Sequence, residues 1–129
     1  MRQPDPPLPT EAELELLGVL WRLGPSTVRD VHAALPPGRD VRYTTVLKLL
    51  QIMAEKGLVL RDESRRAHVY SAAAQAARTQ RRILADLLER AFDGSAARLV
   101  QQALSSRPAS AEEIREIREF LDSLEGGRS

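Results

Sequence analysis

Residues 10–71 carry the pattern that most constrains the fold, because three helix-forming segments are followed by two strand-like runs. The first segment starts at Thr10-Glu11-Ala12-Glu13, a capping box in which the Thr and Glu side chains bond each other's backbone amides. Leucines at helical spacing continue as far as Trp21, and Gly24-Pro25 ends the segment. The pattern predicts one helix between Thr10 and Gly24, and Trp21 is expected to be a core residue of the domain.

The second and third segments have equally clear limits. Ser26 or Thr27 caps the second helix, and Pro36-Pro37-Gly38 ends it. In the third helix, apolar residues fall at positions i, i+3, i+4 and i+7, and Gly57 supplies the left-handed stop after Lys56. The predicted core face of this third helix consists of Val46, Leu49, Leu50 and Met53.

Two short runs, Leu58–Arg61 and Ala67–Ser71, flank a charged turn at 62–66 and predict a β-hairpin. Three helices followed by a hairpin are the order of a winged helix-turn-helix, which places its third helix in the major groove of DNA. The predicted fold class is therefore mainly α, with a winged helix and a small β-hairpin wing in residues 10–72.

The third helix carries a polar face opposite its core face. Thr44 and Thr45 are suited to hydrogen bonds with bases or phosphates, and Lys48 to a guanine edge or a phosphate. Arg42, just before the helix, is placed for a phosphate or a base. The alternative for these residues is a solvated helix face that binds nothing.

The hairpin turn offers a second basic group, where a wing meets the sugar-phosphate backbone or the minor groove. Asp62 and Glu63 on the outgoing side oppose this reading, since acids repel phosphate. The complete set of candidate DNA-binding residues is Thr27, Arg42, Tyr43, Thr44, Thr45, Lys48, Arg65, Arg66 and His68.

Charge is segregated along the chain although the formal net charge is only +1. Residues 22–72 hold nine basic and five acidic side chains, a local +4, whereas residues 108–125 hold two basic and six acidic ones, a local −4. A basic DNA-reading part with a separate, non-binding tail has this distribution.

Residues 73–125 predict a helical dimerisation region, with helices at about 74–92, 96–104 and 110–125. The apolar residues of the long helix cover a wider arc than one core requires, the last helix adds a narrower apolar seam, and nothing else in the chain remains to cover both. We expect a two-fold homodimer; the alternative is a monomer whose helices fold back on the winged helix. The candidate dimerisation residues are Ile83, Leu84, Leu87, Leu88, Phe92, Leu99, Val100, Leu104, Ile114, Ile117, Phe120, Leu121 and Leu124.

The two ends of the chain lack periodic patterns. Residues 1–9 hold four of the eight prolines and predict a disordered or extended lead-in, and residues 126–129 predict a disordered tail. No apolar stretch is long enough to span a bilayer, and the chain contains no cysteine. We therefore expect a cytoplasmic protein with no membrane partner.

An enzymatic role finds little support in the sequence. His32 and His68 form no His-x-x-x-His pair, and no phosphate loop, nucleophile elbow or thiol is present. His32 is expected to be a surface or packing residue. We expect no catalytic residue, no metal site and no cofactor.

With these residues in view, the chain resembles the BlaI/MecI family of penicillinase and methicillin-resistance repressors over about residues 8–71. Beyond Ala72 the similarity is one of layout. The matching stretches are Leu8-Pro9-Thr10-Glu11-Ala12-Glu13-Leu14 with Leu20-Trp21, Thr27-Val28-Arg29-Asp30-Val31-His32, Tyr43-Thr44-Thr45-Val46-Leu47 with Leu50-Gln51, Glu55-Lys56-Gly57-Leu58-Val59, and Arg66-Ala67-His68-Val69-Tyr70.

The resemblance implies a homodimeric repressor that occupies a palindromic double-stranded DNA operator and controls β-lactam-resistance or stress genes. In β-lactam-responsive members, a membrane-bound metalloprotease sensor triggers cleavage near an Asn-Phe bond, and a sensor protease or another inducer-linked partner is implied here. The corresponding residues are Gln102-Ala103, which depart from that pattern. The copper-responsive relatives sense copper through C-terminal cysteines, which this chain lacks. The alternative function is a winged-helix module that binds proteins and not DNA.

Overall fold

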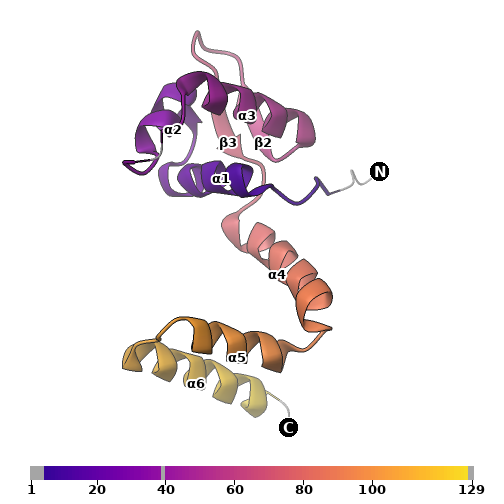
Figure 1. Ribbon diagram of the computed structural model, residues 1–129. Coiled ribbons are helices and arrows are strands. Elements are labelled where there is room, and N and C mark those ends of the chain that lie inside the picture. Colours follow the sequence, from indigo (N-terminus) through magenta and orange to yellow (C-terminus); the bar gives the residue numbers. More distant parts are fainter. Residues whose placement is uncertain (1–4, 39, 128–129) are drawn as a thin grey trace. The chain divides into compact units, whose positions relative to one another are not determined.

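The computed structural model describes residues 5–38 and 40–127, which form six helices and three strands. Close backbone contacts divide the chain into two units, residues 1–84 and 85–129 (Figure 1). The first unit holds the three helices and the sheet of a winged helix-turn-helix, which confirms the predicted, mainly α fold class. The division falls after Leu84, later than the predicted domain boundary after residue 72.

Helix α1 (Glu11–Leu23) begins at the predicted capping box. The Glu13 amide donates to Thr10 Oγ1 at 3.2 Å, and the Thr10 amide donates to Glu13 Oε1 at 2.9 Å. Gly24 adopts φ 80° at the C-terminal end, a conformation that glycine tolerates and most residues do not. The predicted limits of this helix are confirmed.

Helix α2 (Val28–Ala34) has a capping box of its own, in which Thr27 and Asp30 bond each other's amides. Helix α3 (Tyr43–Lys56) ends at Gly57, whose φ of 87° and ψ of 12° make it the predicted left-handed cap. Both helices therefore follow the signals in the sequence.

The sheet differs from the prediction in two ways. Strands β2 (Val59–Asp62) and β3 (Val69–Ala72) pair antiparallel, each starting one or two residues later than predicted. A third strand, β1 (Ser26–Thr27), was not predicted and pairs with β3, so that the strand order is β1-β3-β2. Two residues carry no alternating pattern of their own, and only pairing with a strand about forty residues later makes them a strand.

The core of the first unit lies between α1, α2, α3 and the sheet. Val46, Leu50 and Met53 of α3 are fully buried, while Leu49 is partly buried at the edge. Trp21 is also half-buried against the core, and its indole Nε1 donates to the Ala74 carbonyl at 3.0 Å. The buried apolar residues are Leu16, Leu17, Val19, Leu20, Val28, Val31, Val46, Leu50, Met53, Leu58, Val59 and Tyr70.

One ion pair reaches into this core. The Glu13 side chain is only 2% exposed, and its Oε2 lies 2.7 Å from Lys56 Nζ at the end of α3. Burial by itself raises the pKa of the Glu13 carboxyl, but the hydrogen bonds from Lys56 and Thr10 outweigh it and lower the pKa below its usual value. The Glu13 carboxylate thus stays ionised at neutral pH, and its ion pair with Lys56 joins α1 to α3.

The lead-in makes specific contacts with helix α4 (Ala76–Phe92), which starts two residues later than predicted. Arg78 Nη2 donates to Asp5 Oδ1 at 2.7 Å, and Arg82 Nη2 donates to the Pro6 carbonyl at 2.7 Å. Residues 5–9 are extended and contain no helix or strand. Residues 1–4 of the predicted lead-in lie outside the described residues.

The second unit contains the end of α4, helix α5 (Ala96–Ser106) and helix α6 (Ala111–Gly126). Helix α5 runs two residues past its predicted end, and α6 includes Gly126, the first residue of the predicted tail. Ser110 caps α6 by accepting the Glu113 amide at 3.1 Å. Neither α5 nor α6 contains a buried residue.

Candidate nucleic-acid interface

The polar face of α3 is exposed along its N-terminal half. Thr44, Thr45 and Lys48 are all exposed, because the fully buried Val46 and Leu50 hold the opposite face in the core. Arg42 occupies the N-cap position without a side-chain cap bond, and the first turn contains no acidic residue. The positive end of the helix dipole therefore meets solvent beside cationic and hydroxyl groups, an arrangement that favours phosphate.

Tyr43 is held at the start of α3 by His32. The two rings meet edge to face, with centroids 5.9 Å apart and an interplanar angle of 75°. His32 Nε2 donates to the Val41 carbonyl at 2.8 Å, which ties α2 to the segment that leads into α3. His32 is half-buried, as expected of a packing residue, and it orients the half-exposed Tyr43.

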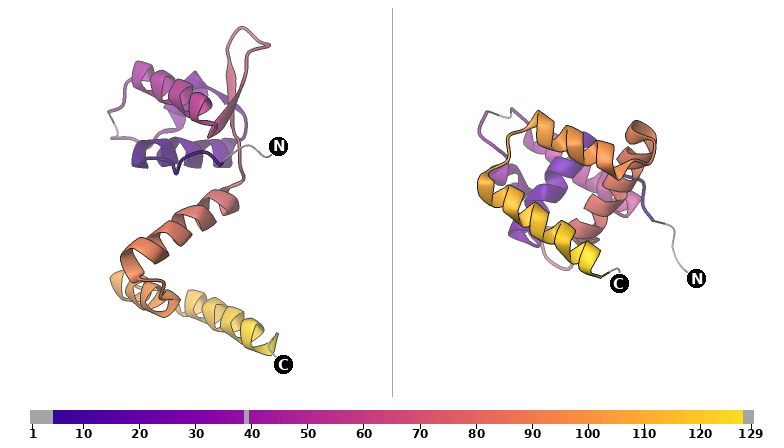
Figure 2. Two further views of the ribbon diagram at one scale, coloured as in Figure 1. Left: turned by 90° about the vertical axis from the view of Figure 1, so that its right-hand side faces the viewer. Right: turned by 90° about the horizontal axis from the view of Figure 1, so that it is seen from below.

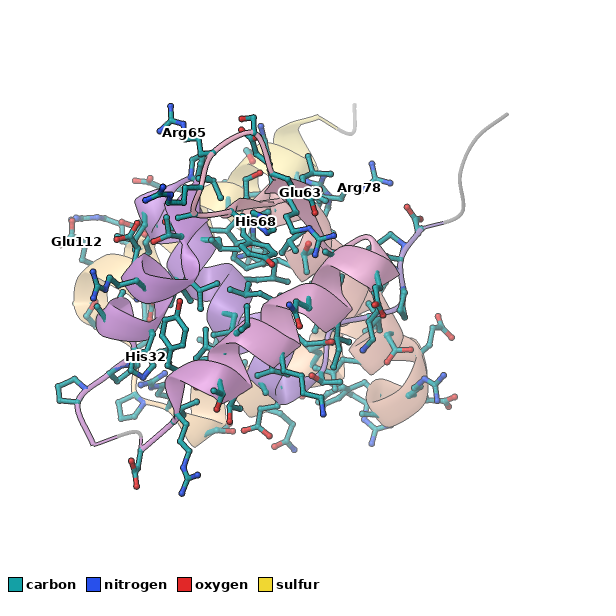
Figure 3. All side chains as sticks on the ribbon, turned by 90° about the horizontal axis from the view of Figure 1, so that it is seen from above. His32, Glu63, Arg65, His68, Arg78 and Glu112 are labelled. Carbon is teal, nitrogen blue, oxygen red and sulfur yellow. The ribbon has the colours of Figure 1, made fainter. Side chains whose placement is uncertain are left out.

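The wing turn between β2 and β3 projects beyond the three helices of the first unit (Figures 1 and 2). Arg65, Arg66 and His68 are exposed on it, and Figure 3 shows Arg65 pointing away from the helices. These three predicted residues are thus accessible to a ligand that approaches the turn.

The two acids of the wing have partners within the wing itself. Asp62 Oδ1 accepts the Ser64 amide at 2.9 Å, and the hydroxyl and amide of Ser64 lower the pKa of Asp62. Glu63 Oε1 lies 2.9 Å from Arg61 Nε. The electrostatic repulsion between these two carboxylates and a phosphate is therefore reduced, because Glu63 pairs with Arg61 and Asp62 accepts hydrogen bonds from Ser64.

An open depression of about 660 Å³ lies between the N-terminal ends of α2 and α3 and the wing. It brings together four of the predicted residues, Thr27, Tyr43, Arg66 and His68, and adds Arg29, which the sequence reasoning missed. Arg29 lies two positions after Thr27, the N-cap of α2. That cap was the only local feature of the sequence that could have placed Arg29 at the start of α2, next to the depression. The residues that line the depression are Thr27, Val28, Arg29, Tyr43, Leu47, Arg66, Ala67, His68 and Tyr70.

The other predicted residues lie outside this depression. Arg42, Thr44, Thr45 and Lys48 lie along or just before the first turns of α3, and Arg65 lies in the wing turn. Thr27 is half-buried, because its hydroxyl is engaged as the N-cap of α2. The structure thus offers two adjoining surfaces of one basic and polar character, and the role of each residue in DNA binding stays a prediction.

The predicted dimerisation residues are all at least partly exposed within the single chain. The half-buried ones are Ile83, Leu88, Phe92, Leu99, Ile114 and Ile117. The exposed ones are Leu84, Leu87, Val100, Leu104, Phe120, Leu121 and Leu124, with exposed fractions from 37% to 61%.

Metal-binding clusters and membrane-spanning helices are both absent from residues 5–38 and 40–127. These residues contain no group of three or more His, Cys, Asp or Glu side chains that could hold a metal ion. None of the helices in the same part of the chain is long and apolar enough to cross a membrane.

Comparison with known proteins identifies relatives along most of the chain. The family described as penicillinase repressor matches residues 9–123. The transcriptional regulator BlaI of Mycobacterium tuberculosis, in strains CDC 1551 / Oshkosh and ATCC 25618 / H37Rv, is 35% identical over 118 residues, which cover 91% of this chain and 85% of the relative.

A solved structure is also similar to this chain. The crystal structure of a transcriptional regulator from Thermotoga maritima aligns with a TM-score of 0.47 and 18% identity, covering 92% of this chain and 75% of the other. The family match and the BlaI identity carry the assignment, and they confirm that the chain is a transcriptional regulator and not an enzyme. The chain belongs to the penicillinase repressor family.

Proposed function

We propose that this protein is a homodimeric transcriptional repressor that binds a pseudo-palindromic DNA operator through its winged helices. One observation carries the proposal: the N-terminal half of α3 presents Thr44, Thr45 and Lys48 to solvent while its other face is locked in the core. A helix that reads base edges needs short polar and cationic groups on a rigid support. Membership in a family of repressors supports the same reading.

The surroundings of α3 favour phosphate contacts on both sides of this helix. Arg29 on α2 and Arg66 and His68 on the wing line the depression next to Tyr43. Phosphate contacts fix the register of a protein on the duplex, while base contacts give specificity. We assign Thr45 and Lys48 to the bases, and these flanking residues to the backbone.

Dimerisation is supported by the lack of buried residues in α5 and α6. Helices of 11 and 16 residues are marginal in water by themselves, because helix nucleation is costly, and neither α5 nor α6 has a buried residue that anchors it in a core. A second copy of the chain would cover their apolar faces and present two winged helices to two half-sites. Two linked half-site contacts give far tighter binding than one.

The family supports β-lactam-resistance or stress genes as targets, with release triggered through a sensor protease. Gln102 and Ala103, at the place of the family's cleavage, are exposed but lie inside α5. A protease cuts extended chain, so cleavage here requires α5 to unfold locally. Because α5 contains no residue that is buried within the single chain, this opening is expected to cost little in a free monomer, and the contacts of the proposed dimer would oppose it.

The test is a mobility-shift titration on the DNA upstream of the protein's own gene. We expect Lys48→Ala and Thr45→Ala each to weaken binding by roughly 10- to 100-fold, which corresponds to the loss of about 1–3 kcal/mol from a base contact. Arg98→Ala, which removes one exposed charge from α5, is the charge-matched control and should bind as the wild type does. Equal binding by all four proteins would refute the assignment of α3 as the recognition helix.

Salt dependence separates DNA binding from the alternative of a protein-binding module. A dimer that neutralises about six to ten phosphates should lose roughly a thousandfold or more in affinity between about 50 and 200 mM salt. The absence of any shift at the lower salt concentration would contradict the repressor function itself.

A further inference from the structure

A second pocket lies within the first unit and shares no lining residue with the depression beside the wing. It has a volume of about 320 Å³, at the lower end of the roughly 300–1,000 Å³ of small-molecule sites. It lies where the lead-in, the C-terminal end of α3 and the start of α4 meet. The lining residues are Asp5, Pro6, Leu17, Gly57, Leu58, Ala73, Ala74, Arg78, Thr79 and Arg82.

The pocket combines an apolar wall with two cations. Leu17 and Leu58 are buried core residues, and Thr79 is the one buried residue of α4. Arg78 and Arg82 lie one turn apart on α4 and are the basic groups of the lining. Among the described residues that line the pocket, Asp5 of the lead-in is the one acidic side chain against two arginines, so the charge of the pocket favours an anion.

The lead-in already supplies oxygen atoms that accept hydrogen bonds from these arginines. Arg78 donates to the Asp5 carboxylate and Arg82 to the Pro6 carbonyl, each at 2.7 Å. Pro6 also lies beside Gly57, since a Cβ built on Gly57 would be 3.8 Å from the Pro6 Cβ. Two consecutive residues of an extended segment thus occupy the rim of the pocket.

The ion pair in this arrangement is easily exchanged. The side chains of Asp5 and Arg78 are 54% and 52% exposed, and ion pairs in such surroundings contribute little. A carboxylate with an apolar body would make the same charge-assisted bonds and bury its body against the wall as well.

We propose that this pocket binds a small organic monocarboxylate, whose carboxylate replaces the Asp5 carboxylate on Arg78 and the Pro6 carbonyl on Arg82, and whose apolar body enters the space lined by Leu17 and Leu58. The lead-in then acts as a tethered competitor, which leaves α4 when the acid binds. This site lies apart from the DNA face, and its test needs no DNA.

The chain carries its own reporter for this pocket. Trp21 is the single tryptophan of the sequence, and its indole nitrogen donates to the carbonyl of Ala74, a lining residue. A ligand that settles against Ala74 changes the surroundings of this indole. Trp21 fluorescence therefore reports occupancy directly.

The experiment titrates the full-length protein with sodium hexanoate and follows Trp21 fluorescence, with hexanamide as the uncharged ligand of the same shape. We expect a saturable change with hexanoate and at least tenfold weaker binding of hexanamide, because a hydrogen bond to a charged group contributes about 1.5–3 kcal/mol, a factor of roughly ten or more. Equal binding of the two compounds would show an apolar crevice only and overturn the proposal.

Variants test the two cations and the competitor separately. Arg78→Gln and Arg82→Gln should each weaken hexanoate binding about tenfold. Arg81→Gln, an exposed arginine of the same helix outside the lining, should leave the affinity unchanged. Asp5→Asn should strengthen binding severalfold, because it removes the competing carboxylate.

The Asp5→Asn variant keeps the test decisive if an arginine variant unfolds, since Asp5 and Arg78 form an exposed pair outside the core. Circular dichroism of each variant verifies the fold. No fluorescence change with hexanoate in both wild type and Asp5→Asn, or an affinity that Arg78→Gln and Arg82→Gln leave intact, would overturn the proposal.

Discussion

The two units of this chain use similar apolar patterns with opposite results. In the first unit the apolar stripe of α3 lies in a core, where Leu50 is 0% exposed. In the second unit the stripe of α6 lies open, where Leu121 is 50% exposed. A helical pattern therefore states which face is apolar, but not which surface covers it. The first unit closes its core within one chain, and the proposed dimer closes the second.

The largest expected effect concerns the closed core. Leu50→Ala should lower the free energy of unfolding by about 2–5 kcal/mol, because it leaves a cavity among fully packed side chains. Urea unfolding followed by circular dichroism measures the change, which should be the same at every protein concentration.

The matched control for this substitution is Leu60→Ala, since Leu60 is 61% exposed on β2. Its effect should stay within about 0.5 kcal/mol. Comparable losses from Leu50→Ala and Leu60→Ala would mean that the core is not packed as described.

The second-largest expected effect concerns the exposed apolar face of α6. Leu121→Asp should weaken self-association roughly thirtyfold or more, because it places a charge in the centre of the proposed helical interface. Light scattering at micromolar concentration should give a dimer for the wild type and a mass near 14.3 kDa for the variant.

Ser123→Asp is the control for the stripe, because it adds the same carboxylate on the opposite side of α6. It should remain a dimer. A wild-type mass equal to that of one chain would refute the proposed dimer. The apolar faces of α5 and α6 would then stay exposed to solvent.

The smallest effect concerns the ion pair that joins α1 to α3. Glu13→Gln should cost about 1–3 kcal/mol at neutral pH, because it weakens the bonds from Lys56 and Thr10 to a buried group. Since the pKa of Glu13 is lowered in the folded protein, this stabilisation is complete above the unfolded pKa of about 4.3.

The same contribution is lost as the pH falls through the still lower folded value. The stability difference between wild type and Glu13→Gln should therefore shrink in acid, as measured by urea unfolding at several pH values. The control is Glu11→Gln, which removes an exposed carboxylate from the first turn of α1 and should change the free energy of unfolding by less than about 0.5 kcal/mol at neutral pH. A difference that is constant from neutral pH down to about pH 2 would contradict the assigned pKa shift.

The helices were predictable because their signals are local. The Thr10–Glu13 and Thr27–Asp30 pairs and the Gly57 stop each act over one turn of chain, so that the sequence within that turn contains the whole interaction. The exposed polar face of α3 followed from the same periodicity that buries Val46 and Leu50.

The features that sequence reasoning missed all depend on distant partners. Strand β1 exists because Ser26 and Thr27 pair with Tyr70 and Val69. Arg29 joins the candidate interface because the wing folds next to α2. The residues next to Ser26, Thr27 and Arg29 carry no periodic pattern that would predict these contacts.

The sequence by itself therefore determined where helices start and stop, which of their faces are apolar, and where charge is concentrated, since each follows from neighbours within a few residues. Only the tertiary structure decided that Glu13 meets Lys56, that Asp5 meets Arg78, and that the Trp21 indole meets the Ala74 carbonyl. Those pairs are separated by 43 to 73 positions, and such contacts form only when packing of the whole unit offsets the entropy of closing the intervening chain.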